Sequence, residues 1–301
     1  MRNLVRFFAP ATIVIFVALH AASIAPAAEN SSPRPRSGDL KPSQADVNTW
    51  VIFGFTEGSD VGSAGERTLF QDASLRTSQR KDGFAAIDGS WGAAYSPTDR
   101  FVVWLGGIAS SEIRSQPRAE TDVGSYYAAG VTAGAKYQLL SRQESPFGLS
   151  VQFSPSWQPL GIGAGEILTG ELRGIVDGAL VLDGWYTALN VAIQPQRTTS
   201  DQGARSYTTT VEISGAITYQ LKDNVFLGGE LRALKKTETA RPWGEGARQL
   251  FAGPSLLVQL GTSGYFGISW SIQIASDASS AEARELALDR HQVRIKSGFS
   301  F

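Results

Sequence analysis

Residues 146–158 read PFGLSVQFSPSWQ, and their side chains alternate in character along the chain. In an extended chain Val151 and Phe153 fall on one face, and Ser150 and Gln152 fall on the other. Period-two alternation predicts a β-strand with one apolar and one polar face. Since the polar face carries serine and glutamine rather than charge, it does not suit a sheet that faces bulk water.

The same alternation recurs in 206–221 and 265–276. Turn residues divide the chain after residue 48 into twelve predicted strands. Segment 67–77 is a candidate for a further strand, which leaves fourteen as the alternative number, but we assign it to the first long loop. The predicted strands span residues 49–57, 83–95, 100–114, 122–139, 146–158, 171–182, 185–195, 206–221, 225–237, 248–260, 265–276 and 288–301.

The connections between these strands alternate in length. Short turns lie near residues 96–99, 140–145, 183–184, 222–224 and 261–264. Long polar loops lie near residues 58–82, 115–121, 159–170, 196–205, 238–247 and 277–287. Short turns at one end and long loops at the other are typical of an antiparallel transmembrane β-barrel.

Aromatic residues mark the ends of the predicted strands that meet the short turns. A barrel that crosses a bilayer carries such rings at the level of the lipid headgroups, whereas a β-sandwich has no reason to carry them. The residues are Tyr95, Phe101, Tyr137, Phe147, Trp185, Tyr219, Phe266 and Phe301.

Composition agrees with an all-β membrane protein. Of 301 residues only 18% are charged, against about a quarter in soluble proteins. The absence of cysteine excludes disulfides, thiol catalysis and cysteine-ligated metals. With 27 basic and 28 acidic residues there is no electrostatic case for binding nucleic acid.

The N-terminus predicts export. Arg2 and Arg6 flank the start of an apolar run over residues 7–19, and an A-x-A pattern follows at Ala25 to Ala27. A charged start, a short apolar run and a small-residue cleavage site predict a secretory signal peptide. The chain therefore divides into a signal peptide at 1–27, a disordered periplasmic leader at 28–48 and a barrel at 49–301.

The last segment, residues 290–301, reads RHQVRIKSGFSF and ends on Phe301. It resembles the C-terminal signal of bacterial outer-membrane β-barrel proteins, which the barrel assembly machinery reads, although Gly298 lies closer to the end than in the usual signal. The resemblance implies that Phe299 and Phe301 form the assembly signal and that the protein lies in the outer membrane of a Gram-negative bacterium.

Residues for catalysis are scarce. His291 is the only histidine after the signal peptide, and no G-x-S-x-G elbow occurs. Its place among the apolar positions of the last strand predicts an outward-facing side chain near the rim. We therefore predict no catalytic residue, no cofactor and no metal site, and a protein that is not an enzyme.

Alternation also places charged side chains inside the barrel, because charge facing hydrocarbon is costly. Six acids and eight bases form this set, and the surplus of bases would favour anions. Either these charges fill a narrow interior with ion pairs, or they line a polar channel; inward-facing glycines such as Gly134 and Gly148 would leave room and favour the channel. The predicted lumen charges are Asp88, Glu112, Arg114, Lys136, Glu171, Arg173, Asp177, Glu212, Glu230, Arg232, Lys236, Arg290, Arg294 and Lys296.

Passive passage of small solutes through a narrow polar lumen is the first functional hypothesis. The alternative is a non-conducting structural or accessory barrel whose extracellular loops bind a partner or polymer. An outer-membrane hydrolase is a third hypothesis, which the single histidine disfavours. The expected partners are outer-membrane lipids, the barrel assembly machinery and a small solute.

Deleting Phe301 tests the assembly signal. Because the terminal aromatic pair is what the assembly machinery would read, the shortened protein should remain in the periplasm and be degraded. Heat-modifiable migration and outer-membrane yield report the outcome, and normal values for both would reject the assignment.

Overall fold

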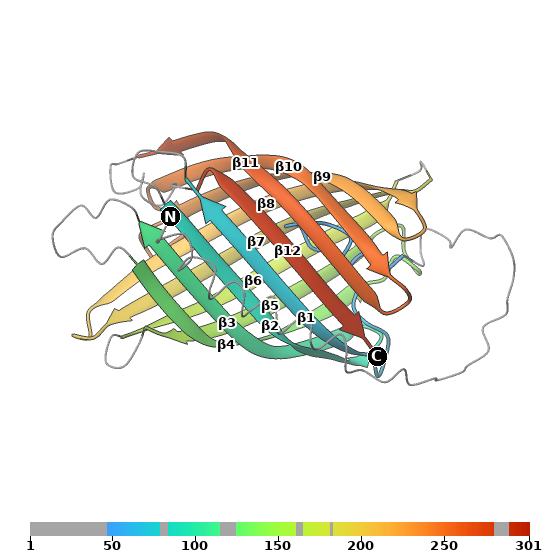
Figure 1. Cartoon of the computed structure of the whole chain (residues 1–301), viewed down its shortest axis with the longest axis horizontal. Helices are drawn as coiled ribbons and strands as arrows, with labels where there is room; N and C mark the ends of the chain where they lie inside the picture. The colour runs from blue at the N-terminus through green and yellow to red at the C-terminus, as the bar shows by residue number, and fades with distance from the viewer. Residues whose placement is uncertain (1–46, 79–83, 115–124, 161–164, 181–182, 280–288) are drawn as a thin grey trace, which may run out of the picture. The chain divides into compact units, whose positions relative to one another are not determined.

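The computed structural model describes residues 47–78, 84–114, 125–160, 165–180, 183–279 and 289–301. The predicted signal peptide and the predicted leader up to residue 46 lie outside them. The described residues contain twelve strands, which form one closed antiparallel barrel in which β1 pairs with β12 (Figure 1). None of the described segments is a helix long and apolar enough to cross a membrane.

The strands follow the chain around the barrel, so that each pairs with its neighbours in sequence. Their bounds are β1 Arg67–Thr77, β2 Phe84–Thr98, β3 Phe101–Arg114, β4 Ser125–Leu140, β5 Gly148–Pro159, β6 Gly165–Ala179, β7 Trp185–Ser200, β8 Arg205–Lys222, β9 Val225–Thr237, β10 Gly246–Leu260, β11 Gly264–Ala278 and β12 His291–Ser300.

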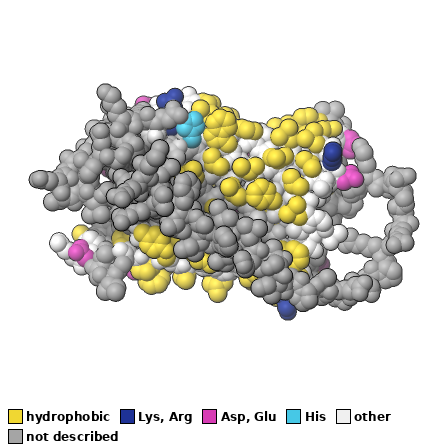
Figure 2. All heavy atoms as spheres, viewed as in Figure 1, with side chains coloured by type: hydrophobic (Ala, Val, Ile, Leu, Met, Phe, Trp, Pro, Cys, Tyr) yellow, Lys and Arg dark blue, Asp and Glu magenta, His cyan; other side chains and the backbone are white. Residues whose placement is uncertain are grey.

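Alternation along the strands separates an apolar outer face from an inner face that carries most of the polar and charged side chains. On β12, Ile295 is 40% exposed on the outside, whereas Gln292 and Lys296 are buried inside. Figure 2 shows hydrophobic side chains across the visible outer surface and charged side chains near the two ends of the barrel. An outer face of this kind suits hydrocarbon rather than water.

Short turns and aromatic rings mark one end of the barrel. The short turns lie at the end where the chain finishes (Figure 1), and two of them contain a glycine with positive φ, Gly184 at 79° and Gly261 at 66°. Aromatic rings on neighbouring strands meet there: the centroids of Trp185 and Tyr219 are 4.9 Å apart. Phe299 and Phe301, both exposed, stack at the same end with centroids 6.3 Å apart.

The prediction of the first strand is wrong. Residues 49–57 form no strand and lie inside the barrel, while β1 comes from 67–77, the segment assigned to a loop. Leu69 and Leu75 face outward from β1, but Phe70 faces inward and packs against buried residues there, which masks the alternation. The total of twelve strands holds because one segment replaces the other.

Two hairpins reach further than predicted at the long-loop end. β7 continues to Ser200 and β8 begins at Arg205, and Thr199 pairs with Arg205 across the strands. β6 begins at Gly165 rather than at residue 171. β-Branched residues have a high β propensity, so Thr198 and Thr199 in β7 and Ile167 in β6 continue the ladder instead of forming long loops.

The apolar core lies inside the barrel, in the half that ends in the short turns. The larger cluster joins Ile52 and Phe53 to inward-facing side chains of the wall, among them Tyr186, Phe226 and Leu257. A smaller cluster joins Val61 to the wall on its other side. The segment before β1 therefore supplies the centre of the fold.

A charge on the outer face tests the orientation of β12. Ile295→Arg should lower the free energy of unfolding by roughly 2–4 kcal/mol, the cost of an arginine near the middle of the bilayer. Urea titration of the protein refolded into lipid vesicles measures it, with Ile295→Val as the control for the apolar contact. An Ile295→Arg protein as stable as the Val variant would place this residue away from lipid.

Candidate functional site: a plugged lumen

Residues 47–62, which we call the plug, occupy the interior of the barrel in the half near the short turns (Figure 1). The plug folds back on itself, so that two arms lie side by side. The backbone N–H of Thr49 in the first arm donates to Asp60 Oδ2 in the second at 2.8 Å. Gly58 is needed at this crossing, because a Cβ there would lie 2.1 Å from the Thr49 carbonyl oxygen.

Charged side chains of the wall hold the tip of the plug. Both carboxylate oxygens of Glu230 on β9 accept backbone N–H groups, one from Gly54 and the other from Phe55 at 2.7 Å. From β12, Lys296 donates to the Phe53 carbonyl and Arg294 donates to the Gly54 carbonyl at 2.9 Å. The wall side chains thus satisfy the backbone of the tip on both its donor and acceptor sides.

The aromatic ring of Phe55 is held by cations. The guanidinium carbon of Arg232 lies 4.1 Å from the ring centroid, within the range of a cation–π contact. Arg294 approaches the same ring at 5.9 Å.

Glu57 follows the tip and is held at its backbone and at its carboxylate. Asn190 on β7 accepts the Glu57 N–H at 2.7 Å and donates to its carbonyl at 2.9 Å. The carboxylate pairs with Arg294 at 3.3 Å. Burial raises the pKa of the Glu57 carboxyl, but the charges of Arg294, Lys296 and Lys136 lower it by more, so the net pKa lies below its ordinary value. Glu57 therefore remains an anion inside the barrel.

The base of the plug is fixed to β4, β5 and β6. Ser59 donates its N–H to Asp177 at 2.8 Å and its hydroxyl to the same carboxylate at 2.6 Å. Lys136 donates to the Gly58 carbonyl at 2.9 Å. Arg142, in the turn after β4, donates to the Val47 carbonyl and pairs with the Asp60 carboxylate.

We call the wall residues that hydrogen-bond the plug the cradle: Lys136, Gln138, Arg142, Ser150, Asp177, Asn190, Glu230, Arg294 and Lys296.

Ion pairs continue along the wall beyond the plug. Arg173 pairs with Glu171 at 3.0 Å and approaches Glu212 at 3.7 Å. Arg232 joins Glu212 at 2.8 Å. Arg76 on β1 pairs with Asp88 at 2.8 Å. The pair of Glu171 and Arg173 lies along β6, and the other pairs lie across strands, so each of these bases has an acidic partner in the wall.

The structure divides the predicted lumen charges into groups. One group contacts the plug: Lys136, Asp177, Glu230, Arg232, Arg294 and Lys296. A second group pairs within the wall: Asp88, Glu171, Arg173 and Glu212. Glu112 and Lys236 are partly buried, the side chain of Arg114 lies outside the described residues, and Arg290 is exposed at the rim before β12.

Sequence reasoning missed several residues of this site. Asp72 on β1 pairs with Arg294, and Asp289 lies 3.5 Å from Arg76, so both add negative charge to the interior. Glu57 and Asp60 add two more carboxylates from the plug. The missed signal was apolar residues at inward positions of the strands, which have no reason to occur in a water-filled lumen.

The inward glycines do not open a channel in this conformation. The indole of Trp104 packs against Gly134, where a Cβ would lie 2.2 Å from a ring carbon. Ser59 of the plug packs against Gly148 in the same way, with a corresponding distance of 2.0 Å to its hydroxyl oxygen. The space that glycine provides is therefore filled by an indole ring and by the plug.

His291 does not join the interior groups. Its ring stacks on Trp270 of β11 with centroids 6.0 Å apart. Trp270 is 46% exposed on the outer face, so this contact lies outside the lumen, away from the buried hydroxyls and carboxylates of the cradle.

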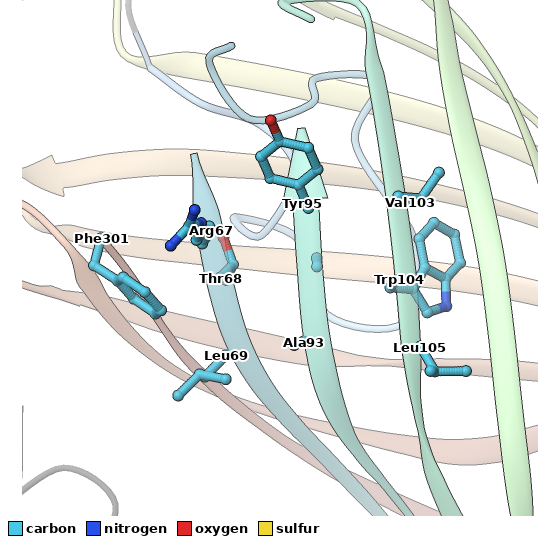
Figure 3. Close-up of a pocket in the computed structure, with 10 residues that line it drawn as sticks. Arg67, Thr68, Leu69, Ala93, Tyr95, Val103, Trp104, Leu105 and Phe301 are labelled. Atoms are coloured by element: carbon cyan, nitrogen blue, oxygen red, sulfur yellow. The ribbon is translucent and has the colours of Figure 1, made fainter. Parts of the chain in front are cut away.

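A shallow hollow of about 370 Å³ lies on the outer side of β1, β2 and β3 near the C-terminus (Figure 3). Leu69, Leu105 and Phe301 line it, and Tyr95 stands at its edge. Since its lining is mostly apolar and belongs to the outer surface, it suits an acyl chain rather than a polar solute.

Two solved structures share this fold. The COG4313 outer membrane channel from Pseudomonas putida F1 is similar with a TM-score of 0.57 and 10% identity, over 81% of this chain and 98% of that one. The translocator domain of the autotransporter NalP from Neisseria meningitidis has a TM-score of 0.51 and 12% identity, over 81% and 91%. At such identities the likeness concerns the outer-membrane barrel fold alone.

The sequence model of one protein family, described as a family of unknown function (DUF6662), matches residues 44–301. The matched region contains the plug as well as the whole barrel. No curated protein matches the sequence.

Removing the Glu230 carboxylate tests the hold on the tip. Glu230→Ala should speed hydrogen exchange of the Gly54 and Phe55 amides by about tenfold to a hundredfold, because hydrogen bonds to a charged partner contribute roughly 1.5–3 kcal/mol. Hydrogen-exchange mass spectrometry of the plug peptide measures this change.

The matched control is Glu144→Ala. Glu144 pairs with Arg100 in an exposed ion pair, with side chains 64% and 46% exposed, and such pairs contribute little. Unchanged protection of the plug in Glu230→Ala would mean that the carboxylate does not hold the tip.

Proposed function

We propose that this chain, which belongs to the family of unknown function DUF6662, is an outer-membrane channel for small solutes that its own plug holds closed. The observation that carries the proposal is that a separate segment of the chain fills the lumen. Inside the barrel wall two arms of polypeptide lie side by side, together with the rings of Phe53 and Phe55. Without the plug, this space is a pore.

Strand number supports the same conclusion. Barrels of about eight strands are filled by their own side chains, and barrels of 16–18 strands leave an aqueous channel. Here the twelve strands seen in the described residues enclose more space than their side chains fill, and a separate segment fills the rest.

The wall beyond the plug is polar, which supports passage of small polar solutes. Gln158 donates to the Ser110 hydroxyl at 3.3 Å, and Thr132 donates to the Pro155 carbonyl at 3.2 Å. Since the bases of the wall have acidic partners nearby, we expect weak charge selectivity rather than the preference for anions that the sequence suggested.

An outer-membrane location is supported by two features. The outer face is apolar, and aromatic rings lie at the short-turn end. The two similar solved structures are consistent with this location. The expected signal peptide would provide the route across the inner membrane.

A non-conducting accessory barrel is the second candidate. The number of contacts between the cradle and the plug favours it, since a segment held so firmly could serve as a permanent core. The two candidates differ in whether weakening the plug creates a conducting pore.

Phe53→Ser/Phe55→Ser weakens the plug without changing the wall. Truncating one buried phenylalanine costs about 3–5 kcal/mol, so the double variant should favour the undocked plug. In planar bilayers we expect rare openings for the unmodified protein and sustained stepwise conductance for the double variant.

Phe147→Ser/Phe266→Ser is the matched control, because it makes the same chemical change on the outer face, where these residues are 43% and 42% exposed. Heat-modifiable migration confirms folding of each variant. A folded Phe53→Ser/Phe55→Ser protein that stays silent would reject the channel and leave the accessory barrel.

A further inference from the structure

We infer that the cradle is an exchangeable peptide-binding site, which releases the plug through the short-turn mouth and accepts a peptide of the same sequence from that side. The inference rests on the proposed function, because it describes how the closed channel opens. It identifies the ligand class as a short peptide with an aromatic–glycine–aromatic tip followed by an acidic residue.

The path of the plug permits its withdrawal. Its first residue, Val47, contacts Arg142 in the turn between β4 and β5. After its last residue the chain passes Ser96, near the end of β2 that leads into the short turn to β3, where Gly65 N–H donates to the Ser96 carbonyl at 2.8 Å. Both ends therefore lie at the short-turn mouth, and the plug can leave as a loop without threading a chain end through the barrel.

Withdrawal does not break the barrel. In the described residues the plug makes no strand ladder with the wall. The barrel closes just after it, where Arg67 N–H donates to the Phe301 carbonyl at 3.1 Å and Phe301 N–H donates to the Arg67 carbonyl at 2.9 Å. The ladder between β1 and β12 thus remains whole whether or not the plug is docked.

The cradle recognises features that any peptide of this sequence carries. Glu230 binds two consecutive backbone N–H groups, and Asn190 binds both backbone groups of one residue. Glycine is required at position 54, where a Cβ would lie 2.1 Å from the Ser269 hydroxyl oxygen. The ring at position 53 enters the apolar cluster, and the ring at position 55 lies under Arg232.

The charge at position 57 completes the match. The Glu57 carboxylate lies 3.3 Å from Arg294, whose guanidinium also pairs with Asp72. Removal of the plug leaves the cationic groups of Arg294 and Lys296 without the carbonyl oxygens they contact. An empty cradle therefore favours a second peptide that restores these contacts.

The first test adds a peptide to the open channel. A synthetic peptide of residues 47–62 is applied to the Phe53→Ser/Phe55→Ser protein in a planar bilayer, first in one chamber and then in the other. When the peptide is added on the short-turn side, we expect loss of most of the open current. The peptide should act at concentrations up to the order of millimolar, which is the effective concentration that a short tether produces. Peptide added on the other side should leave the current unchanged.

The matched control is the same peptide with serine at positions 53 and 55, which should leave the current unchanged. Block by both peptides, block from both sides alike, or no block by the native peptide would each overturn the inference. None of these results affects the proposed function, which fails only if the folded double variant does not conduct.

The second test needs no weakened plug and no current. The chain has no cysteine, so single cysteines can be placed at Thr56 in the plug and at Ser269 in the wall, both buried. A polymer-linked maleimide too large to enter the barrel is applied to the folded protein. We expect Thr56→Cys to be modified slowly and Ser269→Cys to remain unmodified, because only the plug leaves the lumen.

Thr262→Cys, in the exposed turn between β10 and β11, is the control for reagent activity and should react at once. A Thr56→Cys protein that stays unmodified over many hours would mean that the plug does not withdraw. Equal modification of Thr56→Cys and Ser269→Cys would mean that the barrel opens as a whole, which also overturns the inference.

Discussion

Polypeptide inside a closed barrel must find hydrogen-bond partners that the barrel has not already used. The strands satisfy each other's backbone groups around the full circle, so the wall can offer the plug only side chains. A buried N–H or carbonyl without a partner costs free energy comparable to a lost hydrogen bond. Glu230, Asn190 and Lys296 meet this requirement, each with an atom directed at the plug backbone. Many of the charged side chains inside the barrel supply hydrogen bonds of this kind.

This requirement changes how the charged side chains in the lumen are interpreted. Taken alone, Lys136 or Asp177 resembles lining of an aqueous channel. In the structure Lys136 donates to the Gly58 carbonyl and Asp177 accepts from Ser59, so each holds the plug. Removing one member of such a set exposes its partner as an unpaired group in a confined space. Docking of the plug therefore depends on the whole cradle rather than on one ion pair.

The sequence was sufficient to predict the barrel but not the plug, and both results have one physical reason. Alternation reports which face of a strand meets lipid, and it located eleven of the strands around the ladder correctly. It assumes a polar interior, whereas the interior near the short turns also contains two apolar clusters. Phe70 faces that apolar core and so hid β1, while the apolar run at 51–55 was taken for a strand. Tyr186 and Phe226, at inward positions, were the available signal. The contact between Glu57 and Arg294 depends on the way the plug folds back inside the barrel, and no local sequence pattern encodes that path.

The closing contact between Arg67 and Phe301 also sets an order of events during biogenesis. Because β1 pairs with β12, the ladder cannot close until the last residues of the chain have reached the first strand. The cradle draws its side chains from β4 to β12, and Arg294 and Lys296 lie on the closing strand. The cradle is therefore complete only when the ladder closes. The same strand that seals the wall also supplies the last contacts that hold the plug.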